Sequence, residues 1–124
     1  MRLSPDRLAE QVRTAADTGS PVSVKVRAEV DGVSLPDLAG HLAAAGADAV
    51  HVDAMDSEPV VAEIVDAADL FVVANNGVRG RDTAREYFEY GADAVSVGRA
   101  SDDPAVLRAV RETADDWVAR EATL

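Results

Sequence analysis

The chain has 124 residues, enough for one domain with a buried core, and we take residues 1–124 as a single domain. It has no cysteine, which excludes disulfides and thiolate metal sites, and its formal net charge of −11 excludes a broad basic surface for nucleic acid. No charged and then apolar leader opens the chain and no apolar run approaches the roughly 20 residues of a membrane span, so we expect a soluble cytoplasmic protein.

The first half of the chain predicts a helix, a strand, a second helix and a second strand. Ser4 favours the start of a helix, and Gly19 favours its end. Residues 22–27 alternate between valine and polar side chains, which predicts a strand with one polar face. A helix opened by Ser34 follows, and then a strand over residues 48–52.

The second half of the chain repeats this alternation. Residues 57–59 begin a third helix, and the almost entirely apolar run 69–74 predicts a strand that is covered on both faces. A fourth helix ends at Gly91, and a fourth strand covers residues 93–97. Residues 102–104 then cap the last helix.

The order is therefore one helix followed by four strand–helix units, with four strands and five helices. The strands begin near residues 22, 48, 70 and 93, at intervals of 22 to 26 residues. The motif Gly-Ala-Asp-Ala-Val occurs at 46–50 and again at 91–95, 45 residues later. Such regular alternation with short loops predicts an α/β fold with parallel strands joined by right-handed crossovers.

Two architectures fit four such units: a small doubly wound open sheet, or half of a (β/α)₈ barrel. The polar side chains favour the barrel. In a flat sheet Lys25, Arg27 and His51 would lie under apolar helices, at a cost of several kcal/mol each if unpaired. In a barrel they point inward at the carboxyl end, where a ligand binds. We therefore predict the C-terminal half of a TIM barrel, completed by an N-terminal half or by a second copy of the chain.

Two glycine-bearing loops follow the third and fourth strands, at residues 75–80 and 98–101. If these strands are the last two of a barrel, the loops occupy its usual phosphate-binding position. Gly77 and Gly98 let backbone amides approach phosphate oxygens, and Arg99 has the geometry for bidentate pairing. The alternative is an ordinary tight turn beside a surface ion pair.

Lys25 is the only lysine among 12 basic residues, because the other 11 are arginine. This composition is typical of a protein kept soluble in very high salt, although an acidic, high-GC sequence shows the same bias. A lone lysine on the polar face of a strand suggests a role for a compact ammonium group, which can stabilise developing negative charge. Arg27 shares its face and is a candidate for reading the substrate. His51 either faces a ligand or is a core histidine whose hydrogen bonds are made within the protein.

Other kinds of site have little support in the sequence. Two histidines on different elements, with scattered carboxylates, fall short of metal-ligand spacing. Ser23 and Ser96 have no nucleophile-elbow context. We therefore predict no metal site.

Four segments together resemble the second half of FMN-dependent barrel oxidoreductases, chiefly the tRNA-dihydrouridine synthases and the dihydroorotate dehydrogenases. The resemblance covers about residues 20–108. The segments are Val22-Ser-Val-Lys25-Val-Arg27, Gly46-Ala-Asp-Ala-Val-His51, Ala74-Asn-Asn-Gly77-Val78 and Gly91-Ala-Asp-Ala-Val-Ser-Val-Gly98-Arg99.

The resemblance implies FMN as the cofactor and hydride exchange with the C5–C6 bond of a pyrimidine as the reaction. It implies that Lys25 and His51 lie beside the flavin ring. The residues implied to hold the FMN phosphate are Asn76, Gly77, Gly98 and Arg99. It also places the catalytic acid in the first half of the barrel, outside this chain.

The sequence departs from the synthases after the second strand. They usually carry His-x-Arg there, and this chain has His51-Val-Asp53. Both a small pyrimidine and a tRNA uridine therefore remain candidate substrates. A barrel enzyme that binds a phosphorylated substrate without redox chemistry, or a half-barrel dimer that only binds an anion, would also fit the two glycine loops.

Overall fold

The computed structural model describes residues 5–27, 34–54, 58–75 and 77–122. Helices and strands alternate along these residues, as the sequence predicts. The elements are α1 (Pro5–Ala16), β1 (Ser23–Arg27), α2 (Leu35–Ala45), β2 (Ala49–Asp53), α3 (Val60–Ala67), β3 (Phe71–Asn75), α4 (Arg81–Glu89), β4 (Ala94–Ser96) and α5 (Pro104–Ala122).

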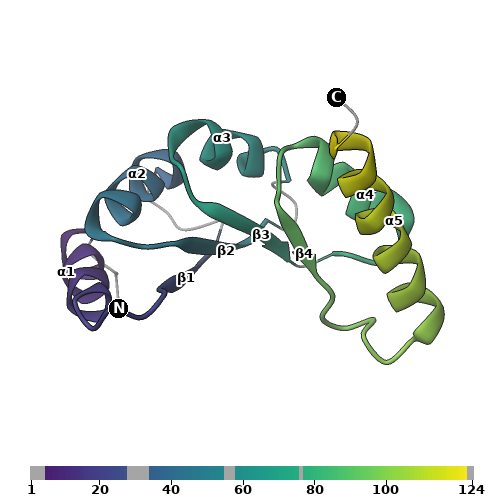
Figure 1. The fold of residues 1–124 in the computed structure, drawn as a ribbon, viewed down its shortest axis with the longest axis horizontal. Coiled ribbons are helices and arrows are strands. Elements are labelled where there is room, and N and C mark those ends of the chain that lie inside the picture. The colour runs from purple at the N-terminus through teal and green to yellow at the C-terminus, as the bar shows by residue number, and fades with distance from the viewer. Residues whose placement is uncertain (1–4, 28–33, 55–57, 76, 123–124) are drawn as a thin grey trace.

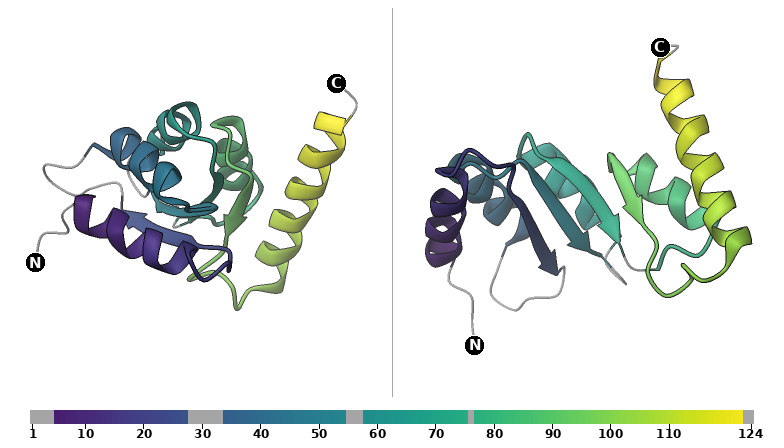
Figure 2. Two further views of the ribbon diagram at one scale, coloured as in Figure 1. Left: turned by 60° about the vertical axis from the view of Figure 1, so that its left-hand side comes forward. Right: turned by 60° about the horizontal axis from the view of Figure 1, so that its bottom comes forward.

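The four strands form one parallel sheet whose spatial order, β1-β2-β3-β4, is also their order in the chain. The sheet curves, and the helices follow its outer side from α1 beyond β1 to α5 beyond β4 (Figure 1). Figure 2 shows the same arc from two further directions. The architecture is therefore the predicted α/β half-barrel, with four parallel strands and five helices.

The core lies between the strands and the helices, on the outer face of the sheet. The central strands contribute Val50, Val52 and Val72, none of which is more than 1% exposed. Leu42 and Ile64 pack against them from α2 and α3. Apolar side chains at alternate strand positions and at helical spacing thus bury one face of each element, which is the main stabilising term of such a fold.

The repeated Gly-Ala-Asp-Ala-Val motif has one structural role at both of its positions. Gly46 and Gly91 end α2 and α4 in the left-handed region, with φ of +108° and +103°. Two residues later, Asp93 donates its backbone N–H to the carbonyl oxygen of Val72 and accepts the N–H of Val72 on Oδ2, both at 2.8 Å. Asp48 makes the same two bonds to Val22, also at 2.8 Å. Each aspartate thus ties the start of its strand to the preceding strand.

Replacing Asp93 with alanine is expected to lower the free energy of unfolding by about 1–2 kcal/mol, because the buried amide of Val72 loses its charged acceptor. Asp48→Ala serves as the matched control. Its bond to Val22 is exposed to water, so its loss should be smaller. Urea denaturation of both variants measures the difference, and equal stability of Asp93→Ala and the parent protein would contradict this role.

The helix ends agree with the sequence in most places. Gly19 follows α1 with a positive φ, and the Asp103 carboxylate accepts the backbone N–H of Ala105 at the start of α5. The third helix begins at Val60, after the predicted 57–59, because the chain forms a turn at Glu58 and Pro59 before the helix. Within the described ranges, no helix has the length and apolar character needed to cross a lipid bilayer.

Candidate functional site

The inner face of the sheet carries the polar side chains that alternate with the core valines. The register aligns Arg27, Asp53, Asn75 and Ser96 in one row at the carboxyl end of the four strands. The adjacent row joins Lys25 to His51. The row at the carboxyl end is therefore polar across all four strands, whereas the adjacent row continues from His51 into Val73 and Ala94. The described helices lie on the other side of the sheet (Figure 1).

Lys25 and His51 are direct register partners on neighbouring parallel strands. Neighbouring strands are about 4.8 Å apart, so both side chains rise from the same small area of the inner face. Lys25 is exposed and His51 is half-buried. The structure thus brings together the two residues that the sequence placed beside one ligand.

A cleft of about 640 Å³ opens beyond the carboxyl ends of β3 and β4, and we call it the loop cleft. Its walls come from the β3–α4 loop, the β4–α5 loop, α4 and the residue before Pro59. The lining residues are Glu58, Asn75, Gly77, Val78, Arg79, Thr83, Glu86, Tyr87, Ser96, Gly98, Arg99 and Ala100. Two loops that are about 20 residues apart in sequence therefore share one cavity.

At the two glycines of the loop cleft, no side chain covers the backbone, so a ligand in the cleft can reach it. Gly77 has φ of +76°, a conformation that favours glycine, and a Cβ atom added there would meet no heavy atom within 4 Å. The same open space surrounds Gly98. On the α4 side, the Thr83 hydroxyl accepts the backbone N–H of Arg79 at 2.8 Å, which fixes the end of the loop. An oxyanion can therefore approach the backbone from the cleft.

The charge of the loop cleft is divided between two arginines and two glutamates. Arg79 and Arg99 come from the two loops, Glu58 comes from the turn before α3, and Glu86 comes from α4. Formally these charges cancel. The cleft is thus less acidic than the whole chain, whose net charge is −11, and two guanidinium groups are available for a phosphate ester.

Tyr87 is a buried polar residue of this cleft that the sequence identified only as part of the buried stripe of a helix. It is 2% exposed. Burial raises the pKa of the Tyr87 hydroxyl to about 12, and the nearby carboxylates of Glu58, Glu86 and Asp53 add to the rise. The hydroxyl therefore stays protonated to a higher pH than that of an ordinary tyrosine.

The raised pKa of Tyr87 predicts alkaline sensitivity. Because the folded-state pKa lies above the ordinary value of 10.0, the unfolded chain releases the proton first. Stability should be unaffected below about pH 10 and should fall as the pH rises toward 12. Tyrosinate absorbance should show a group that titrates near pH 12, which Tyr87→Phe removes. Tyr90 remains in that variant, and burial and the carboxylate of Glu86 raise its pKa as well. Titration of Tyr87 at the value of a free tyrosine would contradict this environment.

The structure divides the predicted site residues into two groups. Gly77, Gly98 and Arg99 line the loop cleft. Lys25 and His51 lie on the open inner face and do not line the cleft. Asn76 lies outside the described residues, and Arg27 lies in the row at the carboxyl end, in register with Asp53.

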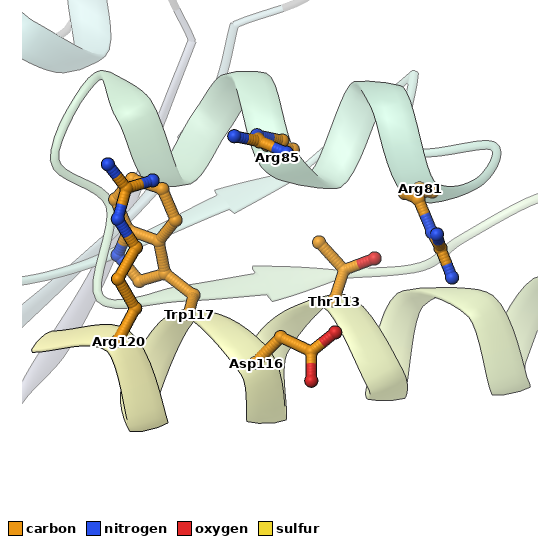
Figure 3. A pocket seen from close by; sticks show the side chains of 6 residues that line it. All are labelled: Arg81, Arg85, Thr113, Asp116, Trp117 and Arg120. Atoms are coloured by element: carbon orange, nitrogen blue, oxygen red, sulfur yellow. The ribbon is translucent and has the colours of Figure 1, made fainter. Parts of the chain in front are cut away.

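Among the described residues, no group of three or more histidine or acidic side chains could hold a metal ion. A smaller cavity of about 160 Å³ lies between α4 and α5 (Figure 3). Arg81 makes an ion pair with Glu112 at 3.7 Å there, and Arg120 lies 5.3 Å above the ring of Trp117. The ion pair joins the two helices, as does the stacking of Phe88 on Trp117 with ring centroids 6.0 Å apart, so we assign this cavity to helix packing.

Comparison with known proteins supports one family. The family model described as dihydrouridine synthase (Dus) matches residues 4–123, which is nearly the whole chain. No curated protein sequence matches the chain significantly. The family match and the fold are therefore the two findings from which function can be argued.

Solved structures support the barrel fold. The Amycolatopsis orientalis BexX/CysO complex contains a chain that superposes with a TM-score of 0.74 at 16% identity, covering 97% of this chain and 52% of that one. The 3-hexulose-6-phosphate synthase from Salmonella typhimurium superposes with a TM-score of 0.61 at 19% identity, covering 94% of this chain and 58% of that one. This chain thus spans little more than half of either structure.

Proposed function

The chain belongs to the dihydrouridine synthase family, and on this premise we propose that it forms the flavin-binding half of a barrel oxidoreductase that acts on the C5–C6 bond of a pyrimidine. The cofactor is FMN. The substrate is a uridine of tRNA or a small pyrimidine.

The single observation that carries the proposal is the loop cleft. Two glycines with open backbone and two arginines share one cavity with two glutamates at the carboxyl ends of the last two strands. The backbone amides and guanidinium groups suit a phosphate monoester, since both offer hydrogens to oxyanions. Gly77, Gly98 and Arg99, with Asn76, would hold the FMN phosphate.

The inner face supplies the second part of the proposed site. Lys25 and His51 share a register position on the polar face, and both would contact the flavin ring. An ammonium group there stabilises negative charge on the ring, and the imidazole can orient it by hydrogen bonding. Arg27, in the row nearest the carboxyl end, would contact the substrate.

When bound, FMN supplies the hydride chemistry, and the residues of this chain bind and orient it. Arg99 and the two glycine loops would hold the phosphate of FMN, and Lys25 would contact its ring. The catalytic acid comes from the other half of the barrel. That half is supplied by N-terminal strand–helix units or by a second copy of this chain.

A flavin titration tests the proposal. We expect FMN to bind when the chain is combined with the N-terminal half of a family barrel, with quenching of flavin fluorescence as the signal. Lys25→Ala should lower the redox rate and leave FMN affinity within about threefold, because the phosphate contacts remain. Absence of FMN binding even with the N-terminal half present would contradict the proposed function.

A second candidate follows from the separation of the two groups of residues. Lys25 and His51 do not line the loop cleft, so the cleft alone could hold a phosphorylated substrate of a barrel enzyme without redox chemistry. Such an enzyme would bind a sugar phosphate as tightly as FMN. It would also tolerate Lys25→Ala without loss of activity. Competition between ribose 5-phosphate and FMN separates the two candidates.

A further inference from the structure

Asp53 ends β2 on the inner face of the sheet, two residues after His51. The segment His51-Val-Asp53 is where the sequence departs from the dihydrouridine synthases. The proposed function assigns roles to Lys25, Arg27 and His51 on this face, and it gives none to Asp53. The role of this carboxylate therefore has to be inferred from its surroundings in this chain.

The two neighbours of Asp53 at the carboxyl end of the sheet can both donate hydrogen bonds. In the register, Arg27 lies beside it on β1 and Asn75 lies beside it on β3. A guanidinium group has only donors, a carboxylate has only acceptors, and a side-chain amide can do either. Three adjacent strands therefore present a donor, an acceptor and a donor in that order.

This row of residues continues into the loop cleft. Asn75 and Ser96 both line the cleft. The negative charge of Asp53 is one cause of the raised pKa of Tyr87, so Asp53 also lies near a residue of the cleft wall. Because β2 lies between β3 and β1 in the sheet, a ligand that extends from the cleft across the row meets Asp53 before Arg27.

Asp53 is half-buried, so its carboxylate is only partly hydrated. An acceptor in such a place is destabilising unless a donor replaces the water that it has lost. Asp53 already interacts with other groups of the protein. Since a carboxylate has two oxygens and about four acceptor sites, it can accept an N–H of a ligand in addition.

A neutral pyrimidine with carbonyl groups at C2 and C4 has the complementary edge. Its N3 carries a hydrogen between two carbonyl oxygens, so the edge offers an acceptor, a donor and an acceptor. Asp53 can accept the N3 hydrogen, and the guanidinium group of Arg27, on its long stem, can donate to one of the carbonyl oxygens. The N3 of cytosine is instead an acceptor, which would oppose the carboxylate and leave it without a donor.

The row at the carboxyl end is formally neutral. The charges of Arg27 and Asp53 cancel, and Asn75 and Ser96 are uncharged. An acidic pyrimidine such as orotate would bring a carboxylate close to that of Asp53, and this repulsion offsets the attraction of Arg27. A neutral ring meets no such repulsion, so the row suits a neutral pyrimidine better than a carboxylated one.

We propose that Asp53 determines substrate specificity by accepting the N3 hydrogen of a neutral pyrimidine, and that it thereby selects uracil over cytosine and orotate. Arg27 donates to the adjacent carbonyl oxygen of the ring. The inference rests on the proposed function for the class of substrate, a pyrimidine. It adds the residue that distinguishes one pyrimidine from another.

Ligand titration followed by saturation-transfer NMR tests the proposal without turnover. The sample is the full chain combined with the N-terminal half of a family barrel, with and without FMN. We expect 1-methyluracil to bind within about threefold of uracil, because its edge at N3 is unchanged. We expect 3-methyluracil and cytosine to bind about tenfold more weakly or worse, since both lack the N3 hydrogen. Equal binding of the two methyluracils, or no binding of uracil, would overturn the proposal.

The variant Asp53→Asn should change the binding of two ligands in opposite directions. Asparagine keeps the shape of the side chain and removes its charge. Binding of 1-methyluracil should weaken about fivefold, because a neutral acceptor replaces a charged one. Binding of orotate should tighten about threefold or more, because the repulsion is lost and Arg27 remains. A side chain that only supports the fold would weaken both ligands alike, and that result would contradict the proposal.

Asp66→Asn is the matched control. It removes one negative charge from an exposed position on α3, which lies on the outer side of the sheet (Figure 1). Every ligand should bind to it as to the parent chain, and circular dichroism should show that both variants are folded. Equal tightening of orotate in the two variants would mean that the net charge of the chain is responsible, and it would overturn the role of Asp53.

Flavin fluorescence of the same samples separates this inference from the proposed function. Quenching by FMN binding without discrimination at N3 contradicts the role of Asp53 and supports the proposed function. Discrimination at N3 that Asp53→Asn abolishes, in samples that bind no FMN, supports the role of Asp53 and contradicts the proposed cofactor.

Discussion

Replacing Gly46 with alanine is expected to lower the free energy of unfolding by about 2–4 kcal/mol. Gly46 ends α2 with φ of +108°, a conformation that an L-residue adopts only at a cost. An added Cβ would also lie 2.8 Å from the Cβ of Ala16 at the end of α1. Because real Cβ atoms do not approach so closely, α1 and α2 would have to separate.

Gly40→Ala is the matched control for this change, in the same helix. Gly40 lies inside α2, and an added Cβ there would meet nothing within 4 Å. Alanine is the better helix former, so this variant should be stabilised by about 0.5–1 kcal/mol. Urea denaturation measures both variants, and a stability of Gly46→Ala equal to that of the parent would show that the α1–α2 approach is not tight.

Replacing Arg99 with alanine is expected to weaken FMN binding by about 10–100-fold, because a guanidinium–phosphate contact contributes about 1.5–3 kcal/mol. The same change should leave riboflavin binding nearly unaffected, since riboflavin lacks the phosphate. Titrating one protein preparation with both flavins separates loss of the phosphate contact from loss of fold.

Arg13→Ala removes the same charge from an exposed position on α1, far along the chain from the loop cleft. It controls for the long-range effect of losing one positive charge from an acidic protein, and FMN affinity should stay within about twofold. Unchanged FMN affinity in Arg99→Ala would mean that the phosphate lies elsewhere.

The fold could be predicted from the sequence because each of its signals is local. Valines at alternate positions predicted the strands, and apolar residues at helical spacing predicted the buried faces of the helices. The regular alternation of strands and helices with short loops predicted that the strands form a parallel sheet. The polar residues of β1 distinguished a barrel from an open sheet, and the register of Lys25 with His51 agrees with that choice.

The site was predictable only where its residues lie on loops or strand faces. Gly77, Gly98 and Arg99 follow strand ends, so topology alone brings them together. Tyr87 lies on a helix, and helical spacing assigns it to the buried stripe without indicating that it lines a cleft. Glu58 and Glu86 reach the same cleft through tertiary packing, which no local pattern encodes.

The two Gly-Ala-Asp-Ala-Val segments divide the chain into modules of about 45 residues that join their neighbours by the same bonds. Each of these connections requires only a glycine with positive φ, an aspartate two residues later and one backbone amide on the preceding strand. Such a connection depends little on the side chains of the strand it attaches to. Duplication of a module therefore preserves the parallel register without new compensating substitutions, and a half-barrel can arise as a doubled quarter-barrel.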